Sequence, residues 1–183
     1  MSTIQTYPWY SEILHKEELL QQGDFIFKCP IVQINSTNYI SNQEIDAEIH
    51  DYDVIVMSQS CDLVPEKKIN LALVCPFYPL SKYVISNPDC KNKEMQKKLH
   101  RGEIISAHLL NEYEFDDQNS DFLVVDFKSV QAIPLKLLKQ ITLTCEKRKR
   151  LLPPYREHLS QAFARFIMRV GLPTDIPKFY EHK

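Results

Sequence analysis

The feature that most constrains the fold is a short apolar run, Val54-Ile55-Val56-Met57, which ends abruptly in the polar stretch Ser58-Gln59-Ser60-Cys61-Asp62. Four consecutive apolar residues, three of them β-branched, are typical of a strand that is buried on both faces. A second wholly apolar run, 71–75, has the same character. We therefore expect these two strands to lie side by side at the centre of a sheet.

The polar stretch 58–62 is compatible with two interpretations. Side chains at the end of a buried strand can be held in fixed positions, and functional sites are often built there. Ser, Asn and Asp also end strands for a local reason, because their side chains bond to the neighbouring backbone. Under both interpretations we expect this stretch to be a polar junction that contacts the C-terminal helix.

The rest of the chain predicts a mixture of helices and strands. We expect helices over 8–22, 91–101, 134–139 and 155–170. The last of these has apolar residues at helical spacing, namely Leu159, Ala162, Phe163, Phe166, Ile167 and Val170. Further strands are expected over 25–34, 45–49, 104–110, 122–127, 130–133 and 141–145, with 45–49 half-buried and Pro30 marking an edge or a bulge. The segment 79–89 is expected to be irregular, and the acidic segment 112–121 is expected to be rich in turns.

These elements predict an α+β protein built on a small, strongly bent, antiparallel β-barrel. The barrel core is expected over 22–145, with an N-terminal helix before it and a long C-terminal helix, 153–171, packed on it. A chain of 183 residues without repeats or a domain-scale linker suits a single domain, 1–183.

Composition excludes several classes of protein. With a net charge of −2 and a pI near 6.3, the chain has no global basic field for nucleic acid or membrane surfaces. No apolar run approaches the roughly 20 residues that span a bilayer. The N-terminus lacks the apolar core of a signal peptide, so we expect a cytoplasmic location. Three glycines exclude a glycine-rich phosphate loop, and we expect no cofactor.

The five cysteines have no disulfide-framework spacing, and we expect free thiols. A metal site would need ligands to converge through the fold, because the chain has no Cys-x-x-Cys or His-x-x-x-His spacing. The candidates for such a site are Cys29, Cys61, Cys75, Asp62 and His50. Packing and surface roles are the alternative for all of them.

A cysteine–histidine site is the sharpest catalytic hypothesis. In it, Cys61 is the nucleophile, Asp62 lies beside it, and His158 of the last helix is the base. The surrounding acidic residues disfavour a thiolate at Cys61, and a buried, inert cysteine is the commoner case.

Charge is distributed unevenly along the chain. From 43 to 66 all the charged residues are acidic, whereas the last helix carries one polar stripe made of His158, Gln161, Arg165 and Arg169. We expect Arg165 or Arg169 to reach Asp51, Asp53 or Asp62, or an external anionic partner. A solvated helix face is the alternative.

The basic run 147–150 could contact nucleic-acid phosphates. A solvated loop, or contacts with the protein's own acidic patch, is the alternative that we favour.

Three segments resemble the MazF/PemK family of small SH3-like β-barrels. Gly23-Asp24-Phe25-Ile26 is similar to that family's opening turn and first strand, and 53–58 to its central strand ending in serine. The segment 124–135 resembles its late strand, kink and short helix. The likeness spans about 22–140 and implies the family's fold.

The likeness does not extend to the family's ribonuclease chemistry. That chemistry implies a basic residue before the central strand, where this chain has His50-Asp51-Tyr52-Asp53, and a Ser or Thr after the next strand, where Ser81 is displaced. Two carboxylates would repel a phosphodiester, so no catalytic residue is carried over. Other segments, including 54–63 and 151–166, resemble uncharacterised bacterial proteins and imply a bacterial source.

Our leading expectation is a non-catalytic MazF-like module that binds a protein partner through Asp51, Asp53, Gln59, Asp62, Arg165 and Arg169. The resemblance implies a toxin–antitoxin or phage-defence setting. The alternative is an enzyme, either a divergent endoribonuclease or a Cys61-centred hydrolase. RNA is the disfavoured partner, a homodimer is compatible with the sequence, and no membrane is expected.

Overall fold

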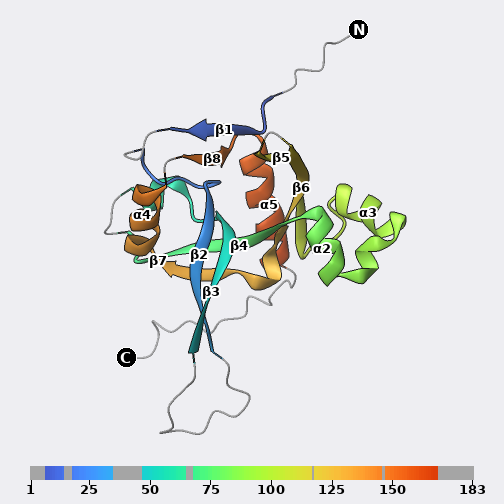
Figure 1. Cartoon of the computed structure of the whole chain (residues 1–183), viewed down its shortest axis with the longest axis horizontal. Coiled ribbons are helices and arrows are strands. Elements are labelled where there is room, and N and C mark those ends of the chain that lie inside the picture. The colour runs from blue at the N-terminus through green and yellow to red at the C-terminus, as the bar shows by residue number, and fades with distance from the viewer. Residues whose placement is uncertain are drawn as a thin grey trace, which may run out of the picture.

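A six-stranded antiparallel sheet organises this α+β protein (Figure 1). The structure is a computed structural model that describes residues 7–14, 18–34, 47–64, 68–116, 118–145 and 147–168. The strand order is β2 (Phe25–Ile34), β3 (Ala47–Val56), β4 (Leu71–Pro79), β6 (Asn119–Asp126) and β5 (Ala107–Asp116), with β7 (Gln131–Pro134) also pairing with β4. A separate antiparallel pair is formed by β1 (Tyr10–Ile13) and β8 (Arg148–Leu151).

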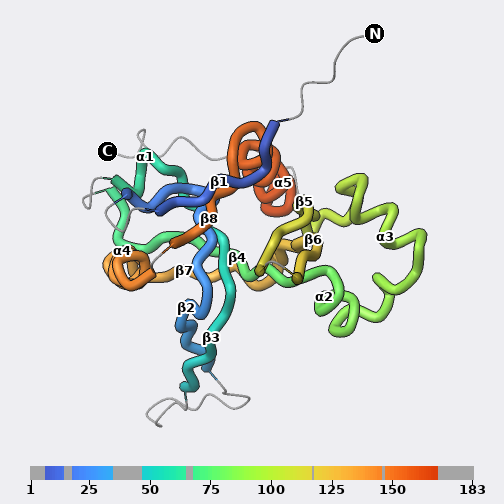
Figure 2. The backbone as a smooth tube through the Cα atoms, turned by 45° about the horizontal axis from the view of Figure 1, so that its top comes forward, coloured from blue at the N-terminus to red at the C-terminus, as the bar shows by residue number. Residues whose placement is uncertain are grey.

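In the described part of the chain, five α-helices and two short 3-10 helices surround these strands. They are α1 (Ser60–Leu63), α2 (Leu80–Ser86), η1 (Pro88–Lys91), α3 (Lys93–His100), η2 (Phe127–Ser129), α4 (Leu135–Thr144) and α5 (Tyr155–Ile167). Figure 2 shows α2 and α3 extending to one side of the sheet, with α5 beside β5 and β6. The predicted helices around 91–101 and 155–167 are confirmed, and residues 169–171 of the predicted C-terminal helix lie outside the described part of the chain.

The sheet bends because β4 changes partners along its length. Its first part pairs with β3 and β7, and its last three residues pair with β6. The predicted central pair is confirmed, since Ile55 of β3 lies opposite Cys75 of β4. Burial on both faces is confirmed too. Ile55 and Met57 belong to one hydrophobic core, while Val54 and Val56 belong to the core on the other face.

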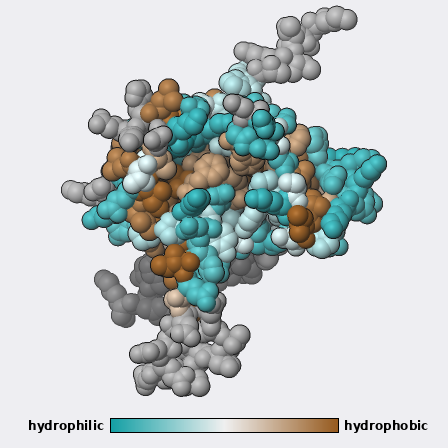
Figure 3. Space-filling view, viewed as in Figure 1, coloured by the Kyte–Doolittle hydropathy of each residue, from teal (hydrophilic) through white to brown (hydrophobic). Residues whose placement is uncertain are grey.

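Three hydrophobic cores hold the helices against the sheet. The first fills the inside of the bend and includes Leu159 and Ala162 of α5. The second packs α4, through Leu135 and Leu138, on the opposite face of β2, β3 and β4. The third packs α2 and α3 against the outer face of β5 and β6. Hydrophilic residues cover the end of the molecule that α2 and α3 form (Figure 3).

The predicted closed barrel is not found among the described residues. The strand ladder leaves β2 at one end of the sheet and β5 at the other. The bend nevertheless brings these two strands together through aromatic rings. The ring centroids of Phe25 and Tyr113 lie 5.4 Å apart, and both side chains are buried. Side-chain packing therefore takes the place of backbone hydrogen bonds at this seam.

Several local predictions are wrong. In place of an N-terminal helix over 8–22, Tyr10–Ile13 form β1, which pairs with β8 near the other end of the chain. The segment 79–89 contains α2, and 141–145 belongs mainly to α4 instead of an edge strand. The segment 112–121, expected to be rich in turns, consists mainly of the two strands of the β5–β6 hairpin.

The far ends of β2 and β3 form a two-stranded ribbon that projects from the body (Figure 1). The expectation of a half-buried strand here is wrong, because Ala47 to Asp51 are all exposed. Pro30 lies in β2, which is an edge strand with a bulge just before it, so that prediction is confirmed.

Candidate functional site

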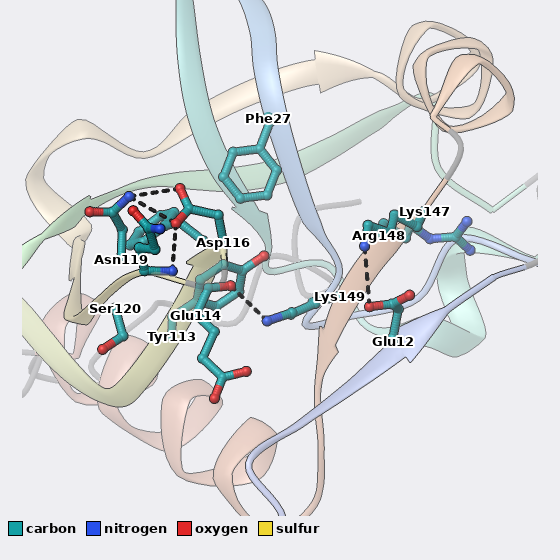
Figure 4. Close-up of a pocket in the computed structure, with 12 residues that line it drawn as sticks. Glu12, Phe27, Tyr113, Glu114, Asp116, Asn119, Ser120, Lys147, Arg148 and Lys149 are labelled. Atoms are coloured by element: carbon teal, nitrogen blue, oxygen red, sulfur yellow. Dashed lines mark hydrogen bonds and ion pairs between the residues drawn. The ribbon is translucent and has the colours of Figure 1, made fainter.

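A groove of about 770 Å³ opens between the β1–β8 pair and the β5–β6 hairpin (Figure 4). Its lining comes from four separate parts of the chain: Glu12 of β1, Phe27 of β2, residues 113–116 and 118–120 of the hairpin, and residues 147–149 around β8. A second hollow, of about 530 Å³, shares Glu12, Glu114 and Lys149 with the first and extends along residues 7–12 of the N-terminal segment. We call the two together the edge groove.

Phe27 lies beside the edge groove at a bulge of β2. The register of β2 against β3 shifts between Ile26 and Cys29, and Lys28 adopts a left-handed backbone with φ of 51°. The Lys28 N–H donates to Asp53 Oδ1 at 3.0 Å. An extra residue in one strand changes the face on which later side chains lie. Phe27 packs on Phe77 as Phe25 does, whereas Cys29, which follows the bulge, turns to the opposite core. Asp53 holds the bulge in place.

Aromatic side chains form the floor of the groove. The ring of Tyr113 lies 6.1 Å from Phe27 and 5.0 Å from Phe115. Tyr113 is buried, whereas Phe27 and Phe115 remain 37% and 39% exposed. The Lys149 ammonium sits 4.3 Å above the Tyr113 ring, a cation–π contact. Burial, with the nearby charges of Asp53 and Glu12, raises the pKa of Tyr113, so its hydroxyl stays protonated.

The rim of the groove carries charges of both signs. Lys147 pairs with Glu12 at 3.7 Å, and Lys149 donates to the Glu114 carbonyl oxygen at 2.8 Å. The Asp116 carboxylate accepts hydrogen bonds from the Asn119 side chain and the Gln118 backbone, which lower its pKa. Within the described residues, no Lys or Arg forms an ion pair with Glu114 or Asp116.

A buried ion cluster anchors β8 under the groove. The fully buried Asp24 carboxylate accepts from Arg148 Nε at 3.0 Å and from Arg150 through both Nε and Nη2. Arg150 also donates to Glu18 Oε1 at 2.6 Å. Both arginines donate further to the Leu19 carbonyl oxygen. The cluster fixes the loop before β2 to β8.

These contacts account for the basic run 147–150. Arg148 and Arg150 are buried in ion pairs, and Lys147 and Lys149 have partners along the groove. The run pairs with acidic groups of the protein itself and is not a solvated loop. Those groups are Asp24, Glu18 and Glu12 and not the acidic surface at 43–66.

The predicted polar junction at 59–62 is linked to α5 indirectly, through Gln22, a residue that sequence reasoning missed. Gln22 is only 5% exposed, and its side-chain amide donates to the Met57 carbonyl oxygen at 2.8 Å and to Ser160 Oγ at 3.0 Å. Its backbone N–H donates to Ser60 Oγ at 3.1 Å. Gln22 therefore ties the end of β3 and α1 to α5.

The described contacts do not bring the catalytic candidates Cys61, Asp62 and His158 together into one site. Cys61 is exposed, with its thiol 3.7 Å from Asp62, which pairs with Lys68 at 3.6 Å. On α5, Ser160 faces the junction, and His158 lies about 200° away around the helix. The described contacts accordingly include none between His158 and Cys61.

The polar stripe of α5 lies near β5 and away from the expected carboxylates. The charges of His158 and Arg165 both influence the pKa of His108 of β5, and the His108 ring stacks on Phe127. Burial, and then the charges of Arg165 and His158, lower the pKa of His108 to about 4. Arg165 has no ion pair among those of the described residues, and Arg169 lies outside that part of the chain.

The other predicted residues are dispersed. Asp51 is exposed on the ribbon opposite Pro30, Gln59 is exposed before α1, and His50 pairs with Glu48 at 3.0 Å. All five cysteines are free. Burial, with Asp51, raises the pKa of Cys29 to about 11, and burial, with Asp126, raises that of Cys75 to about 12. Over the described residues, no group of His, Cys, Asp and Glu is arranged to hold a metal ion.

Sequence reasoning missed the residues that line the groove. Phe27, Phe115 and Lys149 lie far apart in the chain, and only the pairing of β1 with β8 and the bend of the sheet bring them together. The available signal was the Lys28–Cys29–Pro30 break in an otherwise regular strand, which predicted a bulge but not what the bulge positions.

None of the helices described is both long and apolar enough to cross a membrane. Comparisons with protein-family models, with curated proteins and with solved structures found no match to this chain.

Proposed function

We propose that the protein is a non-catalytic interaction module that binds a protein partner, and that the partner enters the edge groove. The observation that carries the proposal is the open aromatic floor of Phe27, Tyr113 and Phe115 beside an edge strand. Partly exposed aromatic side chains in a concave surface are characteristic of protein-binding sites. The polar rim would surround such a contact and exclude water from it.

The bent sheet supports the relation to SH3-like barrels that the MazF/PemK resemblance implies. The approach of β2 and β5 through Phe25 and Tyr113 leaves the sheet one ladder short of closure. A toxin–antitoxin or phage-defence system is the cellular setting that we propose on that resemblance. Binding roles for Asp51, Gln59, Asp62, Arg165 and Arg169 stay predictions, as does a homodimer.

The test uses two exposed phenylalanines on the same hairpin. Phe115 lines the groove and is 39% exposed, whereas Phe122 is 40% exposed and does not line it. Peptides are selected from a random display library against the full-length protein. Selected peptides should bind the wild type and Phe122→Glu alike, and should lose at least about tenfold in affinity for Phe115→Glu, which places a charge on the apolar floor. Equal binding to both variants, or no selected peptide, would contradict the proposal.

A divergent endoribonuclease is a second candidate, favoured by one observation. The charges of Arg165 of α5 and of His158 on the same helix lower the pKa of His108, so these groups are on the same side of β5 and within electrostatic range of it. With RNA, one imidazole would take the proton of the 2′-hydroxyl, the other would protonate the leaving oxygen, and the arginine would neutralise the phosphate. The low pKa of His108 keeps it neutral at pH 7, as a proton acceptor must be.

Incubation with single-stranded and structured RNA tests this second candidate. Cleavage by the wild type that is lost in both His108→Gln and His158→Ala would support it. Intact RNA, or cleavage that persists in both variants, would exclude it.

A further inference from the structure

The outer edge of β5 offers backbone acceptors to the edge groove. Among the described strands, β5 ends the sheet order and pairs only with β6. On its other side, the Asn111 carbonyl oxygen accepts from the Tyr10 hydroxyl at 2.7 Å and the Glu114 carbonyl oxygen accepts from Lys149 at 2.8 Å. Side chains of β1 and β8 thus donate to backbone carbonyl oxygens that could otherwise accept from a neighbouring strand.

Lys149 interacts only weakly with the outer edge of β5. Its ammonium contacts a neutral carbonyl and the face of Tyr113, and it forms no ion pair among those of the described residues. A lysine at a sheet edge is a common device that prevents unwanted strand pairing. A single side-chain hydrogen bond of this kind adds little net free energy, so an incoming strand can displace it.

The side chains that line the edge groove indicate which kind of peptide segment would bind there. The aromatic floor accepts an apolar side chain, and alternate residues of an extended chain point to the same side. Glu114 and Asp116 stand on the hairpin without a Lys or Arg partner among the described ion pairs. A positive side chain on the entering segment would neutralise them.

We propose that an extended segment of the partner adds to the outer edge of β5 as a further strand and displaces Lys149. An apolar side chain of the segment packs on Phe27 and Phe115. A Lys or Arg side chain of the segment lies at Glu114 and Asp116. This inference rests on the proposed function and specifies the partner's segment. Main-chain pairing gives the affinity of such strand addition, and alternate side chains give its specificity.

The experiment uses a peptide selected from the random display library against the full-length protein, with three synthetic forms compared by titration. The parent peptide should lose at least about tenfold in affinity when its alternate amides are N-methylated, because the methyl groups remove main-chain donors. Replacing its basic residue by Glu should cost about tenfold, and the loss should shrink at high salt. Methylation of the intervening amides, which face away from β5, is the matched control.

A protein variant tests the displacement of Lys149. Lys149→Met keeps the stem over Tyr113 and frees the Glu114 carbonyl, so the parent peptide should bind about threefold to tenfold more tightly. Unchanged melting temperature confirms that this variant is folded. Selected peptides whose affinity is indifferent to N-methylation, or to Lys149→Met, would overturn strand addition and leave the proposed function standing. A library without binders would overturn both.

Discussion

At the scale of single residues, the most consequential group is the Asp24 carboxylate. It is fully buried and bonds to two arginines that are themselves 4% and 6% exposed. Removing one partner from a buried ion pair leaves a charge without compensation, which costs more than the pair contributes. Nothing in the local sequence around Gly23-Asp24 indicated that Arg148 and Arg150 would meet this carboxylate across the chain.

Asp24→Asn should lower the free energy of unfolding by about 3–5 kcal/mol, because Arg148 and Arg150 would stay buried and charged. Urea denaturation measures this loss. Glu48→Gln is the matched control, since its pair with His50 is exposed and should be worth less than about 1 kcal/mol. A loss at Asp24 no larger than that at Glu48 would show that the cluster is not structural.

His108 should make stability depend on pH. Burial, and then Arg165 and His158, lower its folded pKa to about 4, while an unfolded histidine titrates near 6.5. Between these values the unfolded state binds more protons, so stability falls as the pH drops below about 6.5. From about pH 7 to about pH 4.5 the wild type should lose about 2 kcal/mol more than His108→Gln. Parallel losses in both proteins, measured by urea denaturation, would contradict this assignment.

At the scale of elements, the bulge in β2 borders the part of the groove floor that Phe27 forms. Asp53 accepts the Lys28 N–H, and Lys28 holds a left-handed backbone that costs a non-glycine residue about 1–2 kcal/mol. The sequence predicted a bulge from Pro30 because proline is excluded from regular central strands. It predicted a binding role for Asp53, whereas the described contact is to the backbone of its neighbouring strand.

Asp53→Ala should therefore destabilise the protein by about 1 kcal/mol and weaken peptide binding in the groove, since Phe27 would lose its fixed position. Asp53→Asn keeps an oxygen acceptor and should retain most of both properties. Thermal unfolding and peptide titration give the two readouts. If Asp53→Ala bound peptide as tightly as Asp53→Asn, the bulge would not be what positions the floor.

At the scale of the whole molecule, sequence patterns predicted the elements whose structure depends on neighbouring residues in the chain. The 3.6-residue spacing of α5 and the apolar runs of β3 and β4 are properties of short segments, and each was predicted correctly. The pairing of β1 with β8 joins Tyr10 to Leu151. The sequence around either residue gives no indication that the two strands pair. The edge groove depends on that pairing, and so it could not be predicted. The single domain over 1–183 and the cytoplasmic location stay predictions.

The central claim is that a partner segment occupies the edge groove. Mapping of backbone amide resonances by NMR, on addition of a selected peptide to the full-length protein, tests it most directly. The largest shifts should fall on β5, on Phe27 and on Lys149, with smaller ones at β1. Shifts that concentrate on the β2–β3 ribbon, at the 58–62 junction or around His158 and Arg165, with β5 unchanged, would contradict the account.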